Sequence, residues 1–145
     1  MEKYFIRDAV VEDIEQIIKI SSADNRWLPE KYQEIIELNI PMIVICNRDN
    51  TTLVAFIVYI IFMDELRILN IGVDKFYTRN GLATRLLEIT FSNAREQNCR
   101  YALLEVKTNN IDAINLYIKL GFVCLCIRKM YYEDRSNAYL MQLIL

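Results

Sequence analysis

Gly81 lies between a strand-like run and a helical pattern, and this arrangement constrains the fold more than any other feature of the sequence. The chain has three glycines in 145 residues, all between residues 70 and 121. An apolar run ends at Val73, and an amphipathic pattern begins at Leu82. A strand, a turn and a helix N-terminus in this order form an anion cradle, because backbone N–H groups and the positive end of the helix dipole point into the turn. Since glycine lacks a side chain, a ligand can approach the backbone closely.

The composition excludes several classes of protein. Hydrophobic residues make up 54% of the chain and charged residues 25%, which is typical of a compact globular protein, and we expect one domain over residues 1–145. The net charge of −2 gives no support for nucleic-acid binding through bulk charge. The longest apolar run, 53–63, is too short to span a bilayer, and the N-terminus lacks the apolar stretch of a signal peptide. We therefore expect a cytoplasmic protein.

The side chains available for chemistry are limited, because the chain has no histidine. This removes the usual general base, the Ser-His and Cys-His nucleophile pairs and the commonest zinc ligand. The spacing of the four cysteines, Cys46, Cys99, Cys124 and Cys126, matches neither a zinc site nor a Cys-x-x-Cys redox motif. We expect buried, reduced thiols, with Cys124 and Cys126 on one face of a strand, and no metal site.

Hydrophobic periodicity predicts an α/β sandwich with a mixed sheet. Strands are expected over residues 4–8, 42–46, 53–63, 66–73, 101–106, 122–131 and 138–145. Helices are expected over about 11–20, from Pro29, from Leu82, and over about 111–119. The last helix follows Asn110, a good N-cap residue, and stops before Gly121, where a C′ glycine belongs.

Two blocks of sequence resemble the GNAT acetyltransferase superfamily, which transfers acetyl from acetyl-coenzyme A to an amine. The turn 78–83 resembles the family motif Gln/Arg-x-x-Gly-x-Gly/Ala at Gly81 and Ala83, with Thr78 in place of Gln or Arg. The segments 104–117 and 120–122 are similar to the ribosomal-protein alanine N-acetyltransferase branch, as are 64–71, 128–132 and 138–141. Where that branch carries Pro-Trp-Ser, this chain has Arg26-Trp27-Leu28-Pro29. The resemblance implies a GNAT-like mixed, mostly antiparallel sheet flanked by helices on both faces.

The resemblance also implies acetyl-coenzyme A as co-substrate, with no metal. Its pyrophosphate would bind backbone amides and the helix end at Arg79, Asn80, Gly81, Leu82, Ala83 and Thr84. The pantetheine arm would pair with backbone groups of Ile71, Gly72 and Val73, and the Val73 N–H would polarise the thioester carbonyl. Asn110 would add a hydrogen bond to the coenzyme. The chain has no Gly-Lys-Ser/Thr, which argues against a Walker nucleotide site.

Glu105 and Tyr117 are the candidate catalytic residues. A strand glutamate commonly faces solvent, but the apolar neighbours of Glu105 favour burial near a cleft, where it would be a usable base. By resemblance, it takes a proton from the acceptor amine, directly or through water. Tyr117 shares an apolar helix face, so a core position is its default interpretation; the resemblance adds a hydroxyl aimed at the coenzyme A sulfur as an acid. Tyr131 and Tyr132 either frame the acceptor or are strand aromatics.

The acceptor is expected to be a protein or peptide N-terminus. Deprotonating a lysine at neutral pH costs about 3.5 kcal/mol more than deprotonating an α-amine, so a single carboxylate base suits the α-amine better. This agrees with the branch that acetylates the N-terminal alanine of a ribosomal protein, and we expect no direct nucleic-acid or membrane partner. Two alternatives stay open: a small amine or antibiotic as acceptor, and a non-enzymatic acetyl-coenzyme A sensor.

Overall fold

The computed structural model describes residues 2–21 and 27–145. Residue contacts divide the chain into two compact units, which are described in turn. Unit 1 comprises Met1–Ile60 and Asn70–Thr90, and unit 2 comprises Ile61–Leu69 and Phe91–Leu145. The expectation of a single domain over residues 1–145 stays a prediction.

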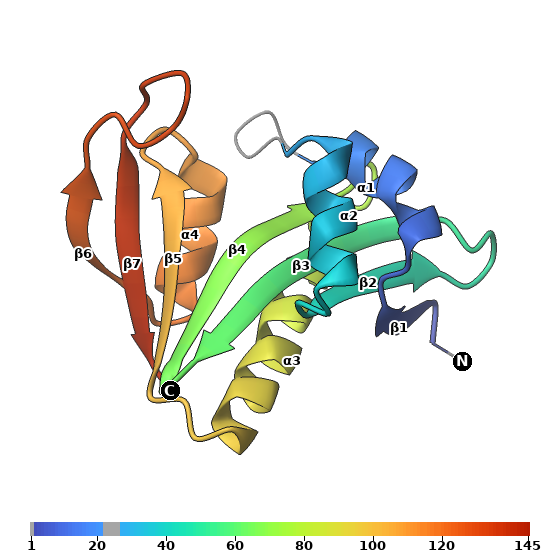
Figure 1. The fold of residues 1–145 in the computed structure, drawn as a ribbon, viewed down its shortest axis with the longest axis horizontal. Helices are drawn as coiled ribbons and strands as arrows, with labels where there is room; N and C mark the ends of the chain where they lie inside the picture. The colour runs from blue at the N-terminus through green and yellow to red at the C-terminus, as the bar shows by residue number, and fades with distance from the viewer. Residues whose placement is uncertain (1, 22–26) are drawn as a thin grey trace. The chain divides into compact units, whose positions relative to one another are not determined.

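Unit 1 is built from the N-terminal elements. Its strands are β1 (Tyr4–Asp8), β2 (Met42–Asn47), most of β3 (Leu53–Phe62) and the end of β4 (Glu65–Val73). Its helices are a 3₁₀ turn η1 (Val11–Asp13), α1 (Ile14–Ile20), α2 (Pro29–Glu37) and the start of α3 (Leu82–Glu96). Antiparallel pairing joins β1 to β2 and β2 to β3, and α1 and α2 lie in contact with each other (Figure 1).

Apolar burial holds unit 1 together. All six residues of β2 and the first seven of β3 are buried, as expected for their continuous apolar runs. Pro29 stands in the first turn of α2, as predicted, because its fixed φ suits a position where no N–H bond is needed. In the next turn Tyr32 is fully buried, and its ring meets Phe56 edge-on at a centroid distance of 6.1 Å.

Unit 2 is built from the C-terminal elements. They are the start of β4, the end of α3, β5 (Tyr101–Lys107), α4 (Ile111–Lys119), β6 (Val123–Arg128) and β7 (Ala138–Ile144). β4 and β5 are parallel, whereas β5–β7 and β7–β6 are antiparallel. α4 lies beside the three C-terminal strands in Figure 1. It ends as predicted, with Gly121 at a φ of +106° that favours glycine.

Hydrogen bonds order the strands as β1-β2-β3-β4-β5-β7-β6 in one seven-stranded sheet. The predicted α/β class with a mixed, mostly antiparallel sheet is therefore confirmed. Two elements differ from the prediction: the helix expected over 11–20 begins as the 3₁₀ turn η1, and the strand expected over 122–131 covers only Val123–Arg128. Within the described parts of the chain, no helix is long and apolar enough to cross a membrane.

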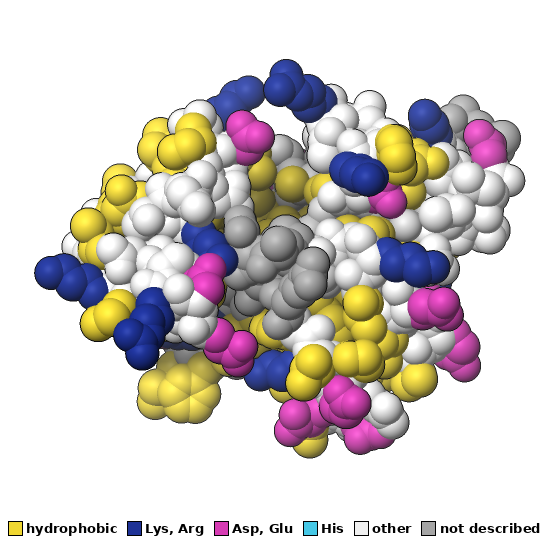
Figure 2. Space-filling view, turned by 90° about the horizontal axis from the view of Figure 1, so that it is seen from above, with side chains coloured by type: hydrophobic (Ala, Val, Ile, Leu, Met, Phe, Trp, Pro, Cys, Tyr) yellow, Lys and Arg dark blue, Asp and Glu magenta, His cyan; other side chains and the backbone are white. Residues whose placement is uncertain are grey.

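β6 is an edge strand, and it corrects the prediction for two cysteines. All six of its residues are exposed, and Figure 2 shows hydrophobic side chains at the edge where Figure 1 places β6. A bulge shifts the register, so that Cys124 lies opposite Met141 and Cys126 lies opposite Leu140. Because adjacent residues of β7 face opposite sides, the two cysteines lie on opposite faces rather than on one. They are also exposed, whereas the other two cysteines are buried as predicted.

Candidate functional site

The turn before α3 has the backbone geometry predicted for it. Arg79 and Gly81 both have positive φ, +64° and +73°, which turns the chain sharply into the helix. A β carbon placed on Gly81 would have no neighbour within 4 Å, so the glycine serves the backbone conformation and an open approach rather than packing. The side-chain amide of Asn80 donates a hydrogen bond to the Tyr77 carbonyl at 3.0 Å, which stabilises the turn.

Backbone donors remain available along this turn. Among the described residues, the N–H groups of residues 78–84 have no hydrogen-bond acceptor. From the first turn of α3, the Arg85 N–H donates back to the Gly81 carbonyl of the loop at 3.0 Å. Unpaired N–H groups at the positive end of a 15-residue helix favour a negatively charged ligand.

The end of β4 carries Ile71, Gly72 and Val73, which are all half-buried in unit 1. A β carbon on Gly72 would lie 2.7 Å from Cε1 of the buried Phe56 ring, so a larger residue would displace that ring. Glycine at this position therefore keeps the strand close to the unit 1 core. Immediately afterwards, the Asp74 N–H donates to the Val54 carbonyl at 2.8 Å, and the chain turns toward residues 78–84.

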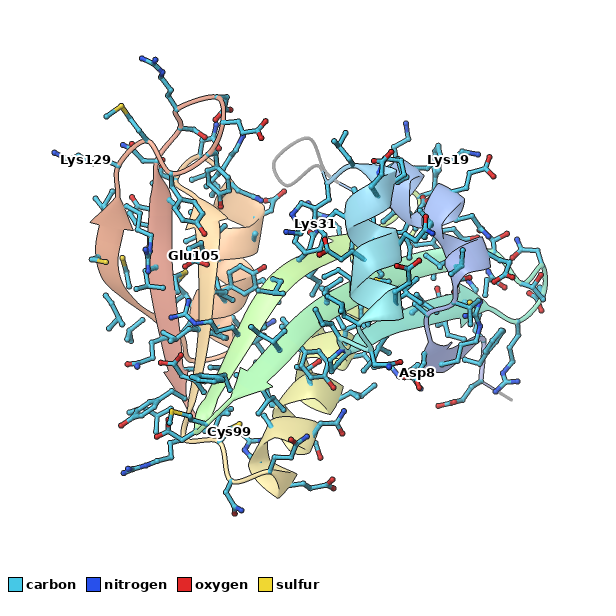
Figure 3. The ribbon with its side chains drawn as sticks, in the orientation of Figure 1. Asp8, Lys19, Lys31, Cys99, Glu105 and Lys129 are labelled. Atoms are coloured by element: carbon cyan, nitrogen blue, oxygen red, sulfur yellow. The ribbon has the colours of Figure 1, made fainter. Side chains whose placement is uncertain are left out.

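Glu105 lies in the middle of β5 in unit 2, where Figure 3 labels it. Its side chain is 16% exposed, which confirms substantial burial, but its surroundings are not the apolar ones predicted. Arg67 Nη1 lies 3.7 Å from Glu105 Oε1, and Arg128 Nε lies 3.6 Å from the same oxygen. Among the described residues, no group donates a hydrogen bond to Oε2.

Sequence reasoning missed Arg67 and Arg128 as parts of this site. Each has a second contact: Arg67 Nε lies 3.2 Å from Glu65 Oε2, and the Arg128 guanidinium lies 5.7 Å from the centre of the Tyr131 ring. The alternation of Glu65 and Arg67 with apolar neighbours in β4 was an available signal for a charged face. The position of Arg128 depends on the bulge in β6, for which the sequence offers no comparable signal.

Asn110 and Tyr117 belong to the same short helix. Asn110 caps α4 as predicted, because its side-chain oxygen accepts from the Ala113 N–H at 3.3 Å. Tyr117 is 6% exposed, and its ring packs against Phe122 at a centroid distance of 5.7 Å. Burial raises the pKa of the Tyr117 hydroxyl to about 12.

The Tyr117 hydroxyl has no hydrogen-bond partner among the described residues. Yet no side-chain oxygen or nitrogen in that part of the chain is both fully buried and unsatisfied. The hydroxyl oxygen is therefore not completely shielded from solvent, although the Tyr117 ring is buried. A neutral phenol in this position can donate a hydrogen bond to a ligand that reaches it.

The two tyrosines after β6 contact each other and two cations. Tyr131 and Tyr132 meet edge-on with ring centroids 5.0 Å apart. Lys107 lies 5.3 Å from the centre of the Tyr132 ring and donates to Asp134 at 2.8 Å. These contacts tie the loop between β6 and β7 to β5.

The predicted site residues therefore fall into two groups. Unit 1 holds the end of β4 and the turn 78–84, and unit 2 holds Glu105, Asn110 and Tyr117. In the loop where the resemblance placed Arg26-Trp27-Leu28-Pro29, Arg26 lies outside the described residues. The Trp27 ring lies 5.4 Å from the Tyr32 ring.

Comparison with known proteins identifies the family of the chain. Residues 11–122 match the acetyltransferase (GNAT) family. An N-alpha-acetyltransferase of Saccharolobus solfataricus is 32% identical over 95% of this chain and 91% of its own length. The ribosomal protein bS18-alanine N-acetyltransferase of Escherichia coli is 36% identical over 97 residues, which are 65% of this chain and 66% of that protein.

Solved structures show the same fold. Ard1 from Thermoplasma volcanium superimposes with a TM-score of 0.90 at 32% identity, over 99% of each chain. The ribosomal-protein-S18-alanine N-acetyltransferase from Escherichia coli has a TM-score of 0.84 at 27% identity, over 97% of this chain and 93% of its own. The resemblance to the ribosomal-protein alanine branch is thus confirmed. The chain belongs to the acetyltransferase (GNAT) family and is an N-acetyltransferase.

Proposed function

We propose that this protein transfers the acetyl group of acetyl-coenzyme A to the α-amine of a protein N-terminus, with Glu105 as base and Tyr117 as acid. The observation that carries the proposal is the state of Glu105. Its side chain is 16% exposed, and its carboxylate accepts no hydrogen bond from the described residues. A carboxylate in this state can accept a proton from an ammonium group, directly or through one water molecule.

The coenzyme is assigned to backbone groups. Residues 79–84 hold the pyrophosphate, because their N–H groups have no acceptor among the described residues and the α3 dipole favours an anion. Ile71, Gly72 and Val73 pair with the pantetheine arm, and Asn110 adds a hydrogen bond from the start of α4. These assignments use the main chain, so Thr78 at the first motif position does not remove the site.

In the proposed reaction, the acceptor ammonium first loses its proton to Glu105. The neutral amine nitrogen attacks the thioester carbonyl, and the Val73 N–H stabilises the developing oxyanion. The tetrahedral intermediate collapses and the C–S bond breaks as Tyr117 donates its proton to the coenzyme A sulfur, which leaves as the thiol. The amine nitrogen loses its second proton, which passes through solvent to the Tyr117 phenolate, and Glu105 releases the first proton to solvent. No cysteine is acetylated in this sequence of steps.

The raised pKa of Tyr117 sets the timing of its proton transfer. Full transfer from a phenol of pKa about 12 to a thiolate whose thiol has a reference pKa of about 8.5 is uphill by roughly 5 kcal/mol. The proton therefore moves as the C–S bond breaks, while the buried surroundings disfavour the free thiolate as well. Before that point Tyr117 acts as a neutral hydrogen-bond donor.

The α-amine is preferred over a lysine side chain for two reasons. Two relatives that match 95% and 97% of this chain are named N-alpha-acetyltransferases, and others, one of which matches 93% of it, are named for the alanine of ribosomal protein bS18. In addition, one carboxylate must deprotonate the acceptor, and a lysine ammonium is about 2.6 pKa units less acidic than an α-ammonium. We propose a protein N-terminus, with a ribosomal protein beginning with alanine as the first candidate.

The test is release of coenzyme A from acetyl-coenzyme A with matched peptides. A peptide with a free N-terminal alanine and one internal lysine is expected to react, with kcat/KM at least about a hundred-fold above that of the same peptide with a formylated N-terminus. Equal rates for the two peptides would refute the α-amine assignment. Faster reaction of a panel of small polyamines and aminoglycosides would favour the small-amine alternative, and coenzyme binding without any turnover would favour the sensor.

A further inference from the structure

Two guanidinium groups converge on Glu105. Arg67 approaches from β4 and Arg128 from β6; in each case the nearest nitrogen–oxygen pair involves Oε1, at 3.7 and 3.6 Å, and no described residue donates a hydrogen bond to Oε2. Building on the function proposed above, we infer that Arg67 and Arg128 are positioning residues that hold Glu105 by Oε1 and leave Oε2 to receive the acceptor proton. We further infer that the bulge in β6 exists to bring Arg128 to this face of the sheet.

The distances indicate a Coulombic hold rather than a hydrogen bond. Both exceed the 2.7–3.2 Å typical of N–H···O bonds, so the acceptor capacity of Oε1 is not saturated and the carboxylate is not locked into a bidentate pair. Because Arg67 approaches from the neighbouring strand β4 and Arg128 approaches from β6 on the other side, across β7, they also restrict rotation of the side chain.

Each arginine is itself held by a second group. Arg67 is paired with Glu65 on the same strand, and Arg128 stacks on the Tyr131 ring. The charged and titratable groups facing Glu105 are therefore the two arginines, with Glu65 and Tyr131 behind them. Lys107 shares this face but is engaged by Asp134 and Tyr132. Because these contacts already restrict the two arginine side chains, less side-chain conformational entropy is lost when the arginines hold Glu105.

The register of β6 explains how Arg128 reaches Glu105. Arg128 lies opposite Ala138, and Ala138 lies opposite Lys107, so Arg128 and Lys107 share a face of the sheet. Glu105, two residues before Lys107 in β5, shares that face too. Without the bulge, the pairing that starts at Val123↔Gln142 would place Ile127 opposite Ala138 and turn Arg128 to the other face. One extra residue in β6 thus replaces an apolar side chain by a guanidinium beside the base.

The first experiment separates binding from turnover. In Arg67→Gln and Arg128→Gln, kcat with an N-terminal alanine peptide is expected to fall about tenfold, while the KM for acetyl-coenzyme A stays unchanged, because the base is misplaced but the coenzyme is not touched. Arg67→Lys and Arg128→Lys are expected to restore most of kcat, since a charge suffices where no hydrogen bond is made. Failure of both lysine variants to restore kcat would overturn the inference of a Coulombic hold.

Lys129 provides the matched control. It follows β6 directly, and Figure 3 shows it pointing away from Glu105. Lys129→Gln removes one positive charge from the same unit and is expected to leave kcat unchanged. A tenfold loss in this variant would mean that overall charge, rather than contact with Glu105, controls the rate, and would refute the positioning role.

The second experiment tests whether the arginines act through Glu105. In a Glu105→Gln background, Arg67→Gln and Arg128→Gln are expected to have no further effect on kcat, so the double-mutant cycles are strongly non-additive. Additive losses would overturn the inference. If Glu105→Gln alone is fully active, the proposed base fails instead. If Glu105→Gln is impaired but both single arginine variants are fully active, the proposed function stands and the positioning role fails.

The third experiment tests whether the face on which Arg128 lies matters. Ile127→Arg is combined with Arg128→Ile, which puts the guanidinium on the other face of β6, because Ile127 lies opposite Tyr139 and Arg128 opposite Ala138. This exchange keeps the composition and the bulge, and it is expected to lower kcat as much as Arg128→Gln. Full activity of the exchange variant would refute the role assigned to the register of β6.

Discussion

Replacing Glu105 with glutamine is expected to lower kcat for an N-terminal alanine peptide about a hundred-fold at pH 7. Glutamine keeps the size of the side chain but cannot take the ammonium proton, so only the neutral acceptor, about one-seventh of the total at pH 7, can react. The rest of the loss arises because no base then assists proton removal during the attack. Affinity for acetyl-coenzyme A should not change, because the groups assigned to coenzyme binding are elsewhere. Steady-state kinetics and calorimetric titration with acetyl-coenzyme A measure the two quantities separately.

The loss of kcat in the Glu105→Gln variant should become smaller as the pH rises. Above the pKa of an α-amine, about 7.8, solvent supplies the neutral amine without a base. The difference between wild type and variant is therefore expected to shrink to about tenfold or less near pH 9.5. Glu96→Gln, an exposed acid at the end of α3, is the control and should match wild type throughout. A pH-independent deficit would argue that Glu105 serves structure rather than proton transfer.

Replacing Tyr117 with phenylalanine is expected to lower kcat about fifty-fold with no loss of stability. The activity falls because no group then donates a proton to the departing sulfur; the effect is moderate because a thiolate is a good leaving group. The free energy of unfolding should stay within about 0.5 kcal/mol, since the hydroxyl has no hydrogen-bond partner among the described residues and the ring contact with Phe122 is kept. Urea unfolding and steady-state kinetics give the two readouts.

Tyr101 offers a matched control for the phenylalanine substitution. It lies at the start of β5 in the same unit, with Arg100 over its ring. Tyr101→Phe removes a hydroxyl of the same kind and should leave kcat unchanged. If Tyr117→Phe loses stability but keeps its activity, the residue is a core tyrosine only, which is the default interpretation of its position in the sequence.

Local patterns predicted most of the secondary structure. Asn110 and Gly121 bound α4 as expected, because capping and positive φ are properties of single residues that periodicity makes visible. The turn at Gly81 was predictable for the same reason. Strand order follows from the family resemblance more than from the pattern, since the apolar runs do not say which strands are neighbours.

The surroundings of Glu105 could not be predicted, because they depend on pairing between distant strands. Arg67 reaches the carboxylate through the parallel pairing of β4 with β5, and Arg128 reaches it through one extra residue in β6. Successive residues of a strand face opposite sides of the sheet, so the sequence assigns a residue to a face only where the strand has no bulge. The same bulge explains why Cys124 and Cys126 lie on opposite faces, against the expectation of a shared face.

The distribution of the cysteines means that chemical labelling can follow the two units separately. Cys46 is buried in unit 1 and Cys99 in unit 2, and burial raises the pKa of both thiols, so neither reacts while its unit is closed. Cys124 and Cys126 are exposed and react at once. After these two are blocked, the rates at which the remaining thiols are modified report the local opening of each unit, without any engineered probe.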